Sequence, residues 1–332
     1  MSADIRAIGL FSGGLDSMLS VRLLQLQGIE VTAMVFVTPF FGAEAAMRAR
    51  EILDVRLVTE EITAPYMEQV LAQPRYGFGK HMNPCIDCHA FMFHRAGRRM
   101  EAEGAHFLFS GEVLGQRPFS QNRRALTTVA EQSGYADYIL RPLSAKLLAQ
   151  TSMEKTGRVD RSRLLDLQGR SRKPQMAWAE ALGLSAYPSP AGGCLLTQED
   201  FSRRLRDLLR GGARVEKRDL EMLKVGRHLR YDPACKVVVG RREQENSRLE
   251  ELCRPGDVRL WVEGVPGPTV VLRHMGEGDP APDALVFAAR AAVRYSDAEA
   301  GTEADVAHDD GRRKGVLRVG ACGDEEIRER MI

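Results

Sequence analysis

Short apolar runs alternate with amphipathic stretches through the first half of the chain. The runs that read as buried strands cover residues 5–11, 31–37, 55–58 and 106–109. Leucine and methionine recur at helical spacing from Leu15 to Leu26, and Gly28 ends this predicted helix. The same spacing predicts helices over 43–53 and 172–182. Strands that alternate with helices indicate βαβ units, so we expect an α/β fold with a doubly wound parallel sheet.

The pattern changes in the second half, where we expect a smaller α+β domain. Residues 199–209 form a basic amphipathic stretch, and Gly211 and Gly212 follow it as a natural boundary. We therefore predict a first domain over 1–198, a linker helix within 199–212 and a second domain over 213–332. In the second domain the pattern favours strands at 236–239, 258–262, 269–272 and 315–319, a helix over 282–295 and a loop over 296–311.

Composition excludes several classes of protein. The 332 residues are 44% hydrophobic and 28% charged, as in globular proteins of about two domains. Neither a long apolar segment nor a signal-peptide pattern occurs, so we expect no membrane attachment. Six cysteines are too few for a disulfide scaffold, which favours the reducing cytoplasm. Residues 201–274 hold seventeen basic and eleven acidic side chains, and this local excess suits a polyanionic partner.

A glycine-rich turn joins the first predicted strand to the first helix. Glycines let the backbone approach a ligand closely, and the following helix offers free N–H groups to phosphate. Asp16 is a candidate ligand for Mg²⁺ on those phosphates. The predicted phosphate loop consists of Ser12, Gly13, Gly14, Leu15, Asp16 and Ser17.

This SGGxDS sequence resembles the PP-loop ATP pyrophosphatases. The resemblance implies that ATP is split to AMP and pyrophosphate and that a carbonyl oxygen of a substrate is adenylated. It also places Met34, Val35 and Phe36, at the end of the second strand, beside the adenine.

Two further segments resemble the ThiI-type tRNA 4-thiouridine synthetases. One runs from Ser110 through Gly111 to Gln116 and on to Gln121, and the other is the Arg-Pro-Leu at 141–143. The resemblance implies that Gly111 and Gln116 help to bind the nucleotide. Ala145 replaces the acidic residue expected before Lys146.

Cys85, Cys88 and Cys194 are the candidate sulfur-handling residues. The residues alone allow a zinc site completed by His89, a redox pair, or an iron–sulfur cluster with one open iron. A Cys-x-x-Cys with a distant third cysteine resembles the [4Fe–4S]-dependent tRNA thiolases, which favours a cluster on these three residues. The segment at 83–85 also resembles 2-thiouridylases, in which two cysteines pass a persulfide, so Cys85 with Cys194 is the alternative.

The second domain resembles the RNA-binding domain of NFACT-type proteins. The resemblance rests on the Gly-Arg-Arg at 240–242, the segment from Asp257 to Trp261 and the Pro-Gly-Pro at 266–268. Basic side chains there would contact phosphates with little sequence choice, and Trp261 could stack on a base. The candidate RNA contacts are Arg227, Arg230, Lys236, Arg241, Arg242 and Arg273.

Together the motifs predict an ATP-dependent tRNA sulfurtransferase that replaces a uridine carbonyl oxygen with sulfur. Its expected partners are ATP, Mg²⁺, tRNA and a sulfur donor, either sulfide or a cysteine desulfurase; no pattern predicts an oligomeric state. Sulfur transfer or amidation of a small molecule is one alternative. A non-catalytic RNA-binding adaptor that holds ATP is the other.

Overall fold

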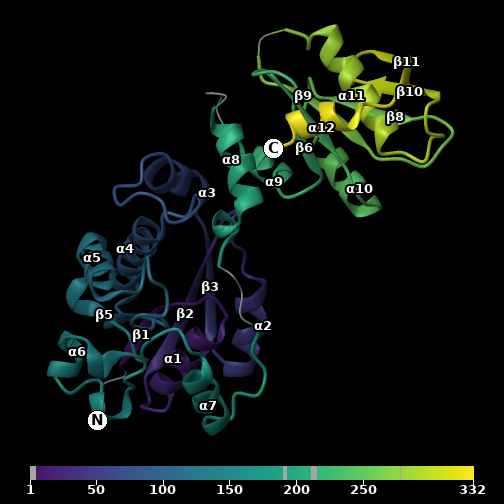
Figure 1. The fold of residues 1–332 in the computed structure, drawn as a ribbon. Coiled ribbons are helices and arrows are strands. Elements are labelled where there is room, and N and C mark those ends of the chain that lie inside the picture. Colours follow the sequence, from purple (N-terminus) through teal and green to yellow (C-terminus); the bar gives the residue numbers. More distant parts are fainter. Residues whose placement is uncertain (1–4, 190–192, 211–214, 277) are drawn as a thin grey trace. The chain divides into compact units, whose positions relative to one another are not determined.

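The computed structural model describes residues 5–189, 193–210, 215–276 and 278–332 (Figure 1). The chain forms two compact units, Met1–Thr197 and Gln198–Ile332, and each is described by itself. The expected boundary at Gly211 and Gly212 lies outside the described residues. Among the described residues no helix is both long and apolar enough to cross a membrane.

The first unit is built on a five-stranded parallel sheet with the strand order β3-β2-β1-β4-β5. This confirms the predicted doubly wound α/β class. Each predicted strand is present within a few residues of its expected ends. The strands are β1 (Arg6–Leu10), β2 (Glu30–Val37), β3 (Arg56–Glu61), β4 (Phe107–Ser110) and β5 (Ile139–Leu140).

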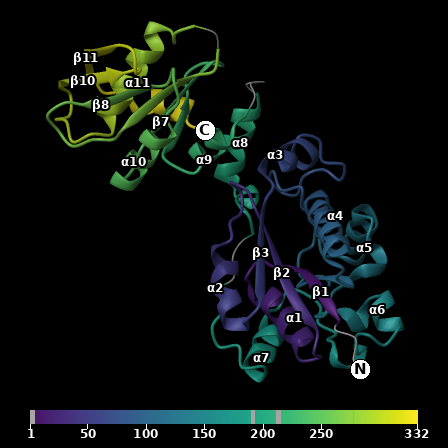
Figure 2. The same cartoon turned by 180° about the vertical axis from the view of Figure 1, so that it is seen from behind.

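Helices cover both faces of this sheet (Figures 1 and 2). On one face α1 (Leu15–Gln25), α2 (Glu44–Leu53) and α7 (Lys173–Ala181) share a hydrophobic core with alternate strand residues such as Ala33 and Phe109. On the other face lie α4 (Cys85–Glu103) and α5 (Arg123–Ser133), which pack on each other. Shorter helices are α3 (Thr63–Tyr66), which continues as a π-helical turn over Met67–Leu71, and α6 (Ser152–Lys155).

The order of the parallel strands changes side between β1 and β4. Strands β2 and β3 extend to one side of β1, and β4 and β5 extend to the other. In such sheets the carboxyl ends of the strands at the reversal form the ligand crevice. The Ser-Gly pairs that follow β1 and β4 therefore lie at this crevice, as their positions in the sequence predict.

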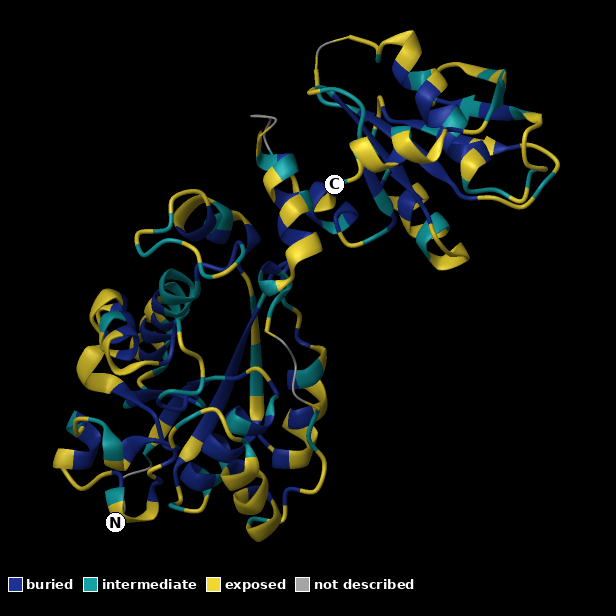
Figure 3. Cartoon of the chain, in the orientation of Figure 1, coloured by how far each residue is buried: buried dark blue, intermediate teal, exposed yellow. Residues whose placement is uncertain are grey.

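The second unit contains a six-stranded antiparallel sheet with the order β11-β10-β8-β9-β7-β6. Its buried residues concentrate in the inner strands of the sheet, such as β7 and β9, which are dark blue in Figure 3. The strands are β6 (Arg227–Arg230), β7 (Cys235–Val239), β8 (Val258–Val262), β9 (Val270–His274), β10 (Glu303–Asp309) and β11 (Lys314–Gly320).

Helices pack on both faces of this sheet as well. The apolar face of α11 (Pro282–Arg294) joins strand residues in the larger core, while α10 (Glu243–Leu252) contributes Leu249 and Leu252 to a smaller core with Val238. The remaining helices are α8 (Glu199–Arg210), α9 (Lys217–Met222) and α12 (Asp324–Arg330).

The prediction of a loop over residues 296–311 is wrong, because β10 (Glu303–Asp309) occupies most of the second half of this range. Its residues are largely polar, so the segment lacks the apolar alternation of a typical strand. Hydrogen bonding to β8 on one side and to β11 on the other stabilises it, and Val306 supplies its buried anchor. Tertiary pairing thus overrides a weak local preference for strand.

Candidate active site and nucleic-acid interface

The six residues of the predicted phosphate loop span the turn after β1 and the first turn of α1. Gly14 caps α1 with extended backbone angles and leaves the first helical N–H groups without a side-chain cap. The Ser17 hydroxyl donates to the Gly14 carbonyl at 2.8 Å, and the Gly14 amide donates to the Ser12 hydroxyl at 3.3 Å. Free N–H groups at the start of a helix form a natural anion site.

Two glycines allow neighbouring segments to approach this loop closely. Gly13 has φ +73°, and a Cβ there would lie 2.3 Å from the backbone of Ala45 at the start of α2. A Cβ on Gly111, after β4, would lie 2.5 Å from the Asp16 carbonyl carbon and from the Ser17 amide nitrogen. The predicted role of Gly111 near the nucleotide therefore has a steric basis: only glycine lets the segment after β4 rest against the loop.

Asp16 is held between the loop and the segment after β4. The side-chain amide of Gln116 donates to Asp16 Oδ2 at 3.0 Å, which brings together two candidate residues a hundred positions apart. Burial raises the pKa of Asp16, and Gln116, Arg172 and Arg117 partly offset that rise. Asp16 Oδ1 is buried and has no hydrogen-bond partner among the described residues. An orphaned carboxylate oxygen beside a phosphate loop suits Mg²⁺.

The side chains expected beside the adenine are buried in the sheet. Met34, Val35 and Phe36 each expose 5% or less of their surface, and Val35 packs in the core that α1 and α2 share. The Met34 carbonyl accepts from the Phe11 amide at 2.8 Å, immediately before the phosphate loop. Adenine contact by these three residues stays a prediction.

A buried carboxylate next to the loop orients a histidine. Glu112 accepts from Arg141 Nε at 2.9 Å, and its other oxygen lies 2.7 Å from His89 Nδ1. The Ser110 hydroxyl donates to the same carboxylate at 3.0 Å. Burial alone would raise the pKa of Glu112, but Arg141 and His89 outweigh it and lower the pKa to about 2. His89 follows Cys88 directly, so this network ties the start of α4 to the nucleotide side of the site.

Three distant segments bring the candidate cysteines together. Cys85 and Cys88 lie in the first turn of α4, and Asn83 donates to Cys85 Sγ at 3.2 Å. Hydrogen bonds attach the segment that follows Cys194 to Phe40 and to Met82. The Leu195 amide donates to the Phe40 carbonyl at 3.1 Å, and the Met82 amide donates to the Leu196 carbonyl at 3.2 Å.

The three thiols interact electrostatically with one another and with Tyr66. Burial raises the pKa of Cys194 to about 11, and Cys85 adds to the rise. Burial also raises the pKa of Cys88, and the charges of Cys194 and Cys85 raise it further, whereas Tyr66 lowers it. The sequence prediction that these cysteines converge is thus consistent with the structure, and all three are free thiols.

The arrangement of the cysteines bears on whether they could hold a single metal ion or an iron–sulfur cluster. Within the described residues, no three His, Cys, Asp or Glu side chains converge on a position where they could hold a single metal ion. Neither the zinc site nor the iron–sulfur cluster is therefore supported by a ligand set among the described residues, and both stay predictions. An iron–sulfur cluster places different demands on its protein, because each thiolate binds a different iron atom and soft thiolates are the preferred ligands.

Arg117 lies between the phosphate loop and the segment that carries Cys194. Its charge acts on Asp16, and its Nη1 atom lies 3.2 Å from the position that a Cβ on Gly193 would occupy, next to Cys194. Sequence reasoning missed Arg117, Tyr66, Arg172 and the His89–Glu112 pair. Glu112 and Arg117 lie within the segment at 110–121 that the sequence already identified, whereas nothing in the local sequence indicated Tyr66.

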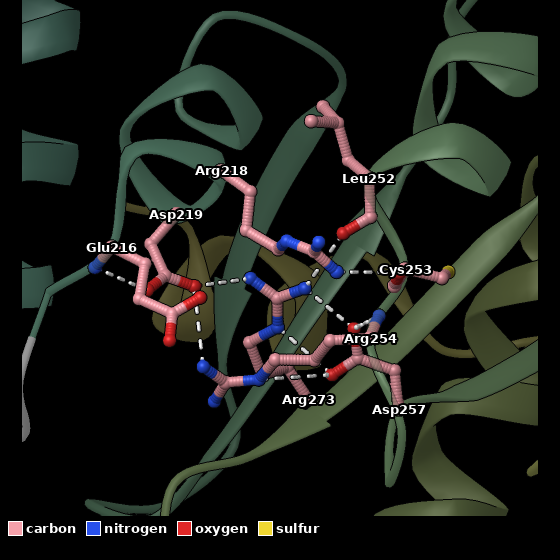
Figure 4. Close-up of polar contacts among 8 residues, drawn as sticks. All are labelled: Glu216, Arg218, Asp219, Leu252, Cys253, Arg254, Asp257 and Arg273. Carbon is pink, nitrogen blue, oxygen red and sulfur yellow. Dashed lines mark hydrogen bonds and ion pairs between the residues drawn. The ribbon is translucent and has the colours of Figure 1, made fainter.

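In the second unit, Arg273 is buried within an ion-pair network (Figure 4). Its guanidinium donates to Asp219 at 2.6 Å and to Asp257 at 2.8 Å, and Arg254 reaches Asp219 from the surface. Burial alone would lower the pKa of Arg273, but these carboxylates keep it raised. The prediction that Arg273 contacts RNA is therefore wrong, because its side chain is only 4% exposed and its donors are used internally.

Lys236 also serves the interior of this unit rather than its surface. It lies 3.0 Å from Asp207 of α8, and Arg230 binds the same carboxylate at 2.6 Å. Burial lowers the pKa of Lys236 to about 8 even though Asp207 opposes the shift. Lys236 is thus excluded as a phosphate contact. Arg230 is a fifth exposed and is engaged by Asp207, so it attaches α8 to the sheet.

Three of the predicted RNA contacts have accessible side chains. Arg242 is exposed at the start of α10, and Arg241 is 43% exposed while paired with Glu245. Arg227 stacks on the ring of Tyr295, with 4.6 Å between the guanidinium carbon and the ring centroid. Trp261 is 40% exposed on β8, so its ring is open to solvent rather than buried in the core.

Two family models match the chain at the positions of these two sites. The model described as thiamine biosynthesis protein (ThiI) matches residues 3–147, and the NFACT protein RNA binding domain matches residues 226–331. The first match includes the phosphate loop, Gly111, Gln116 and two of the three cysteines. The second includes the sheet of the second unit.

Curated relatives align with part of the chain, in alignments that are 154 residues long. The tRNA-specific 2-thiouridylases MnmA of Bradyrhizobium sp. (strain ORS 278) and of Rhodopseudomonas palustris (strain BisB5) are each 28% identical over 41% of this chain. The match spans only 39% of each relative's length. A solved 4-thiouridine synthetase–RNA complex with bound ATP aligns with a TM-score of 0.35 and 20% identity, over 54% of this chain and 51% of that one. The chain is thus similar to the ThiI family over residues 3–147 and to the NFACT RNA-binding domain over residues 226–331.

Proposed function

We propose that the protein is an ATP-dependent tRNA sulfurtransferase. The observation that supports the proposal is that one segment, residues 110–117, contacts the phosphate loop and also residues next to Cys88 and Cys194. Gly111 rests against the loop, Glu112 orients His89 beside Cys88, and Arg117 lies between Asp16 and the Cys194 turn. A site for activating an oxygen thus adjoins a site that can supply sulfur.

ATP binds with its phosphates at the start of α1. Backbone N–H groups and the hydroxyls of Ser12 and Ser17 receive the phosphate oxygens, while Asp16 Oδ1 takes part in holding Mg²⁺. Gln116 fixes the Asp16 carboxylate in the required orientation through its bond to Oδ2. The two glycines at positions 13 and 111 keep the loop in this shape.

Adenylation turns a poor leaving group into a good one. The carbonyl oxygen of a uridine attacks the α-phosphate, the bond to the β-phosphate breaks, and pyrophosphate leaves. Charge that develops on the phosphate oxygens is stabilised by the loop amides and by the guanidinium of Arg117. AMP is then the group that sulfur displaces from the base.

Sulfur comes from the side of the site that carries the cysteines. Cys85, Cys88 and Cys194 would hold a [4Fe–4S] cluster, which when bound offers an open iron for a sulfide ligand. In the alternative, a persulfide on Cys85 or Cys194 attacks the activated carbon and AMP leaves. The other cysteine then breaks the S–S bond, which leaves sulfur on the base and a disulfide on the protein.

The second unit would hold the tRNA through its backbone phosphates. Arg227, Arg241 and Arg242 provide accessible cations, and Trp261 offers an exposed aromatic face. Such contacts give affinity with little sequence preference. Selection of the modified uridine would then depend on the first unit.

Mass spectrometry of tRNA nucleosides from a strain that lacks the protein tests this function. We expect one thionucleoside to disappear and to return with the wild-type gene. Genes that carry Asp16→Ala or Cys194→Ala should not restore it, whereas Cys322→Ala, which changes a buried cysteine outside the site, should. Unchanged thionucleosides in the deletion strain would refute the proposal.

Anaerobic purification separates the two sulfur mechanisms. A cluster predicts a brown protein with about four irons whose colour is lost on replacing any one of the three cysteines. A colourless protein that still thiolates tRNA would instead favour the persulfide. Activity that survives Cys88→Ala but neither Cys85→Ala nor Cys194→Ala points to the same alternative.

A further inference from the structure

Tyr66 packs beside the segments that carry the three thiols. It ends α3, and its residue surface is 0% exposed. Its ring packs against Phe40, Phe41 and Phe91, with 5.9, 5.7 and 6.5 Å between ring centroids. Phe91 belongs to α4, and the Phe40 carbonyl accepts the hydrogen bond from Leu195, so Phe40 links the Tyr66 ring to the segment that carries Cys194.

The hydroxyl of this residue lacks a well-aligned acceptor. It is buried and makes no hydrogen bond of normal geometry with any described residue. Its polar neighbours are thiols: burial raises the pKa of Tyr66 most, the charge of Cys88 and a distorted hydrogen-bonding contact with Cys88 raise it further, and Cys194 and Cys85 add to the rise. A hydroxyl so placed stays protonated and can only donate its proton to an acceptor on the cysteine side.

Packing does not explain why this residue is tyrosine. Three aromatic neighbours surround the ring, and phenylalanine would fill the same space without a polar group. Burying a hydroxyl without a partner destabilises the folded protein. The hydroxyl therefore carries a cost that a purely structural residue would not carry. Thiols are weak acceptors, whereas an anionic sulfur held by a cysteine is a strong one.

We propose that Tyr66 is a positioning residue that donates a hydrogen bond to the sulfur atom carried by Cys85, Cys88 and Cys194. The inference rests on the proposed function, since it requires the cysteines to carry transferable sulfur. It applies to a persulfide and to sulfide on a cluster alike, because both present an anionic sulfur to the hydroxyl. By fixing that atom, Tyr66 would aim it toward the adenylated base.

Tyr66→Phe isolates the hydroxyl, and Tyr135→Phe is its control. Tyr135 is also buried, but its hydroxyl lies beside Glu101 rather than beside a thiol. The full-length proteins are loaded anaerobically with sodium polysulfide, and cyanide-releasable sulfur is followed over time in dilute dithiothreitol. In a parallel arm they are reconstituted with ferrous iron and sulfide, and acid-labile sulfide is followed instead.

Loss of one hydrogen bond should make Tyr66→Phe release sulfur about fivefold faster than wild type. The arm that responds identifies the form of sulfur, and Tyr135→Phe should match wild type in that arm. Without sulfur, Tyr66→Phe should unfold at the same urea concentration as wild type or a higher one, because the removed hydroxyl has only a poorly aligned thiol as its partner. These opposite effects on stability and sulfur retention are the signature of a donor that serves bound sulfur.

Two results would overturn the assignment. One is equal sulfur retention by wild type and Tyr66→Phe, which removes the role of Tyr66 alone. The other is a clear fall in the urea midpoint of unloaded Tyr66→Phe, which would show that the hydroxyl already serves the fold. Wild-type protein that takes up sulfur in neither arm would overturn the proposed function and this inference together.

Discussion

Gly111→Ala tests whether the close approach of residues 110–117 to the phosphate loop organises the site. The added Cβ would lie 2.5 Å from the carbonyl carbon of Asp16 and from the amide nitrogen of Ser17. Non-bonded carbon contacts are comfortable near 3.5 Å or more, so the two backbones must separate by about 1 Å. Parallel pairing of β1 with β4 holds both segments, and neither contact is the end of a flexible side chain.

Forcing extra atoms into a packed site costs about 1–3 kcal/mol. Replacing glycine with alanine returns about 0.4–1 kcal/mol through the unfolded chain, so we expect a net loss of about 1–2 kcal/mol. Displacement by about 1 Å near the reacting groups should also lower ATP turnover on the order of a hundredfold. Gly14→Ala is the matched control for stability. Its φ is −80°, and its Cβ would meet only the Ser12 hydroxyl oxygen at 3.4 Å.

The chain has two tryptophans, and each unit contains one of them: Trp178 in α7 and Trp261 in β8. In a Trp261→Phe background, urea unfolding followed by fluorescence therefore reports on the first unit alone. We expect the free energy of unfolding to fall for Gly111→Ala and to stay level or rise for Gly14→Ala. The reasoning fails if Gly111→Ala unfolds with the background protein, or if both substitutions are equally destabilising.

Three other predictions concern charged groups. Arg273→Leu leaves Asp219 and Asp257 buried without their partner. It should lower the free energy of unfolding, followed by Trp261 fluorescence, by about 3–5 kcal/mol. Arg248→Ala, at an exposed ion pair, should lower it by only about 0–1 kcal/mol. Because the pKa of Glu112 is lowered from 4.5 to about 2, its stabilising effect is present above pH 4.5 and lost as the pH falls to about 2. Wild type should therefore lose stability more steeply over that interval than Glu112→Gln, and equal slopes would contradict the pairing. Arg242→Gln should weaken RNA binding and reduce the salt slope by about 1, whereas Arg312→Gln should leave both unchanged; identical slopes would remove Arg242 from the interface.

The fold of the first unit was largely predictable because the periodicity of apolar residues within each segment identifies it as a strand or a helix. Buried strands such as β1 and β2 are continuous apolar runs, and α1 shows a regular apolar spacing. The phosphate loop was predictable for the same reason, since its six residues are adjacent. In contrast, β10 has one large apolar anchor, and only its two neighbouring strands make it a strand.

The rest of the site depends on contacts between residues far apart in sequence. Asp16 and Gln116 are a hundred positions apart, and His89 and Glu112 are twenty-three apart, so no local pattern pairs them. Counting basic residues also misled at Lys236 and Arg273, because a positive charge in the sequence does not reveal whether a carboxylate is buried beside it. Lys236 directly precedes an apolar strand segment and Arg273 directly follows one, and that context is the available sign that both face inward.

The segment at 110–117 contacts both halves of the proposed site. Gly111 packs against the phosphate loop, and Glu112 is hydrogen-bonded to His89. Arg117 lies between Asp16 and Gly193, which precedes Cys194. Protein interiors transmit displacement because they are closely packed. A shift of this segment therefore moves the activated oxygen and the sulfur source together. The Asn83–Cys85 contact and the Tyr66 hydroxyl, by contrast, lie on the cysteine side of the site, so changes there should alter sulfur handling while ATP turnover persists.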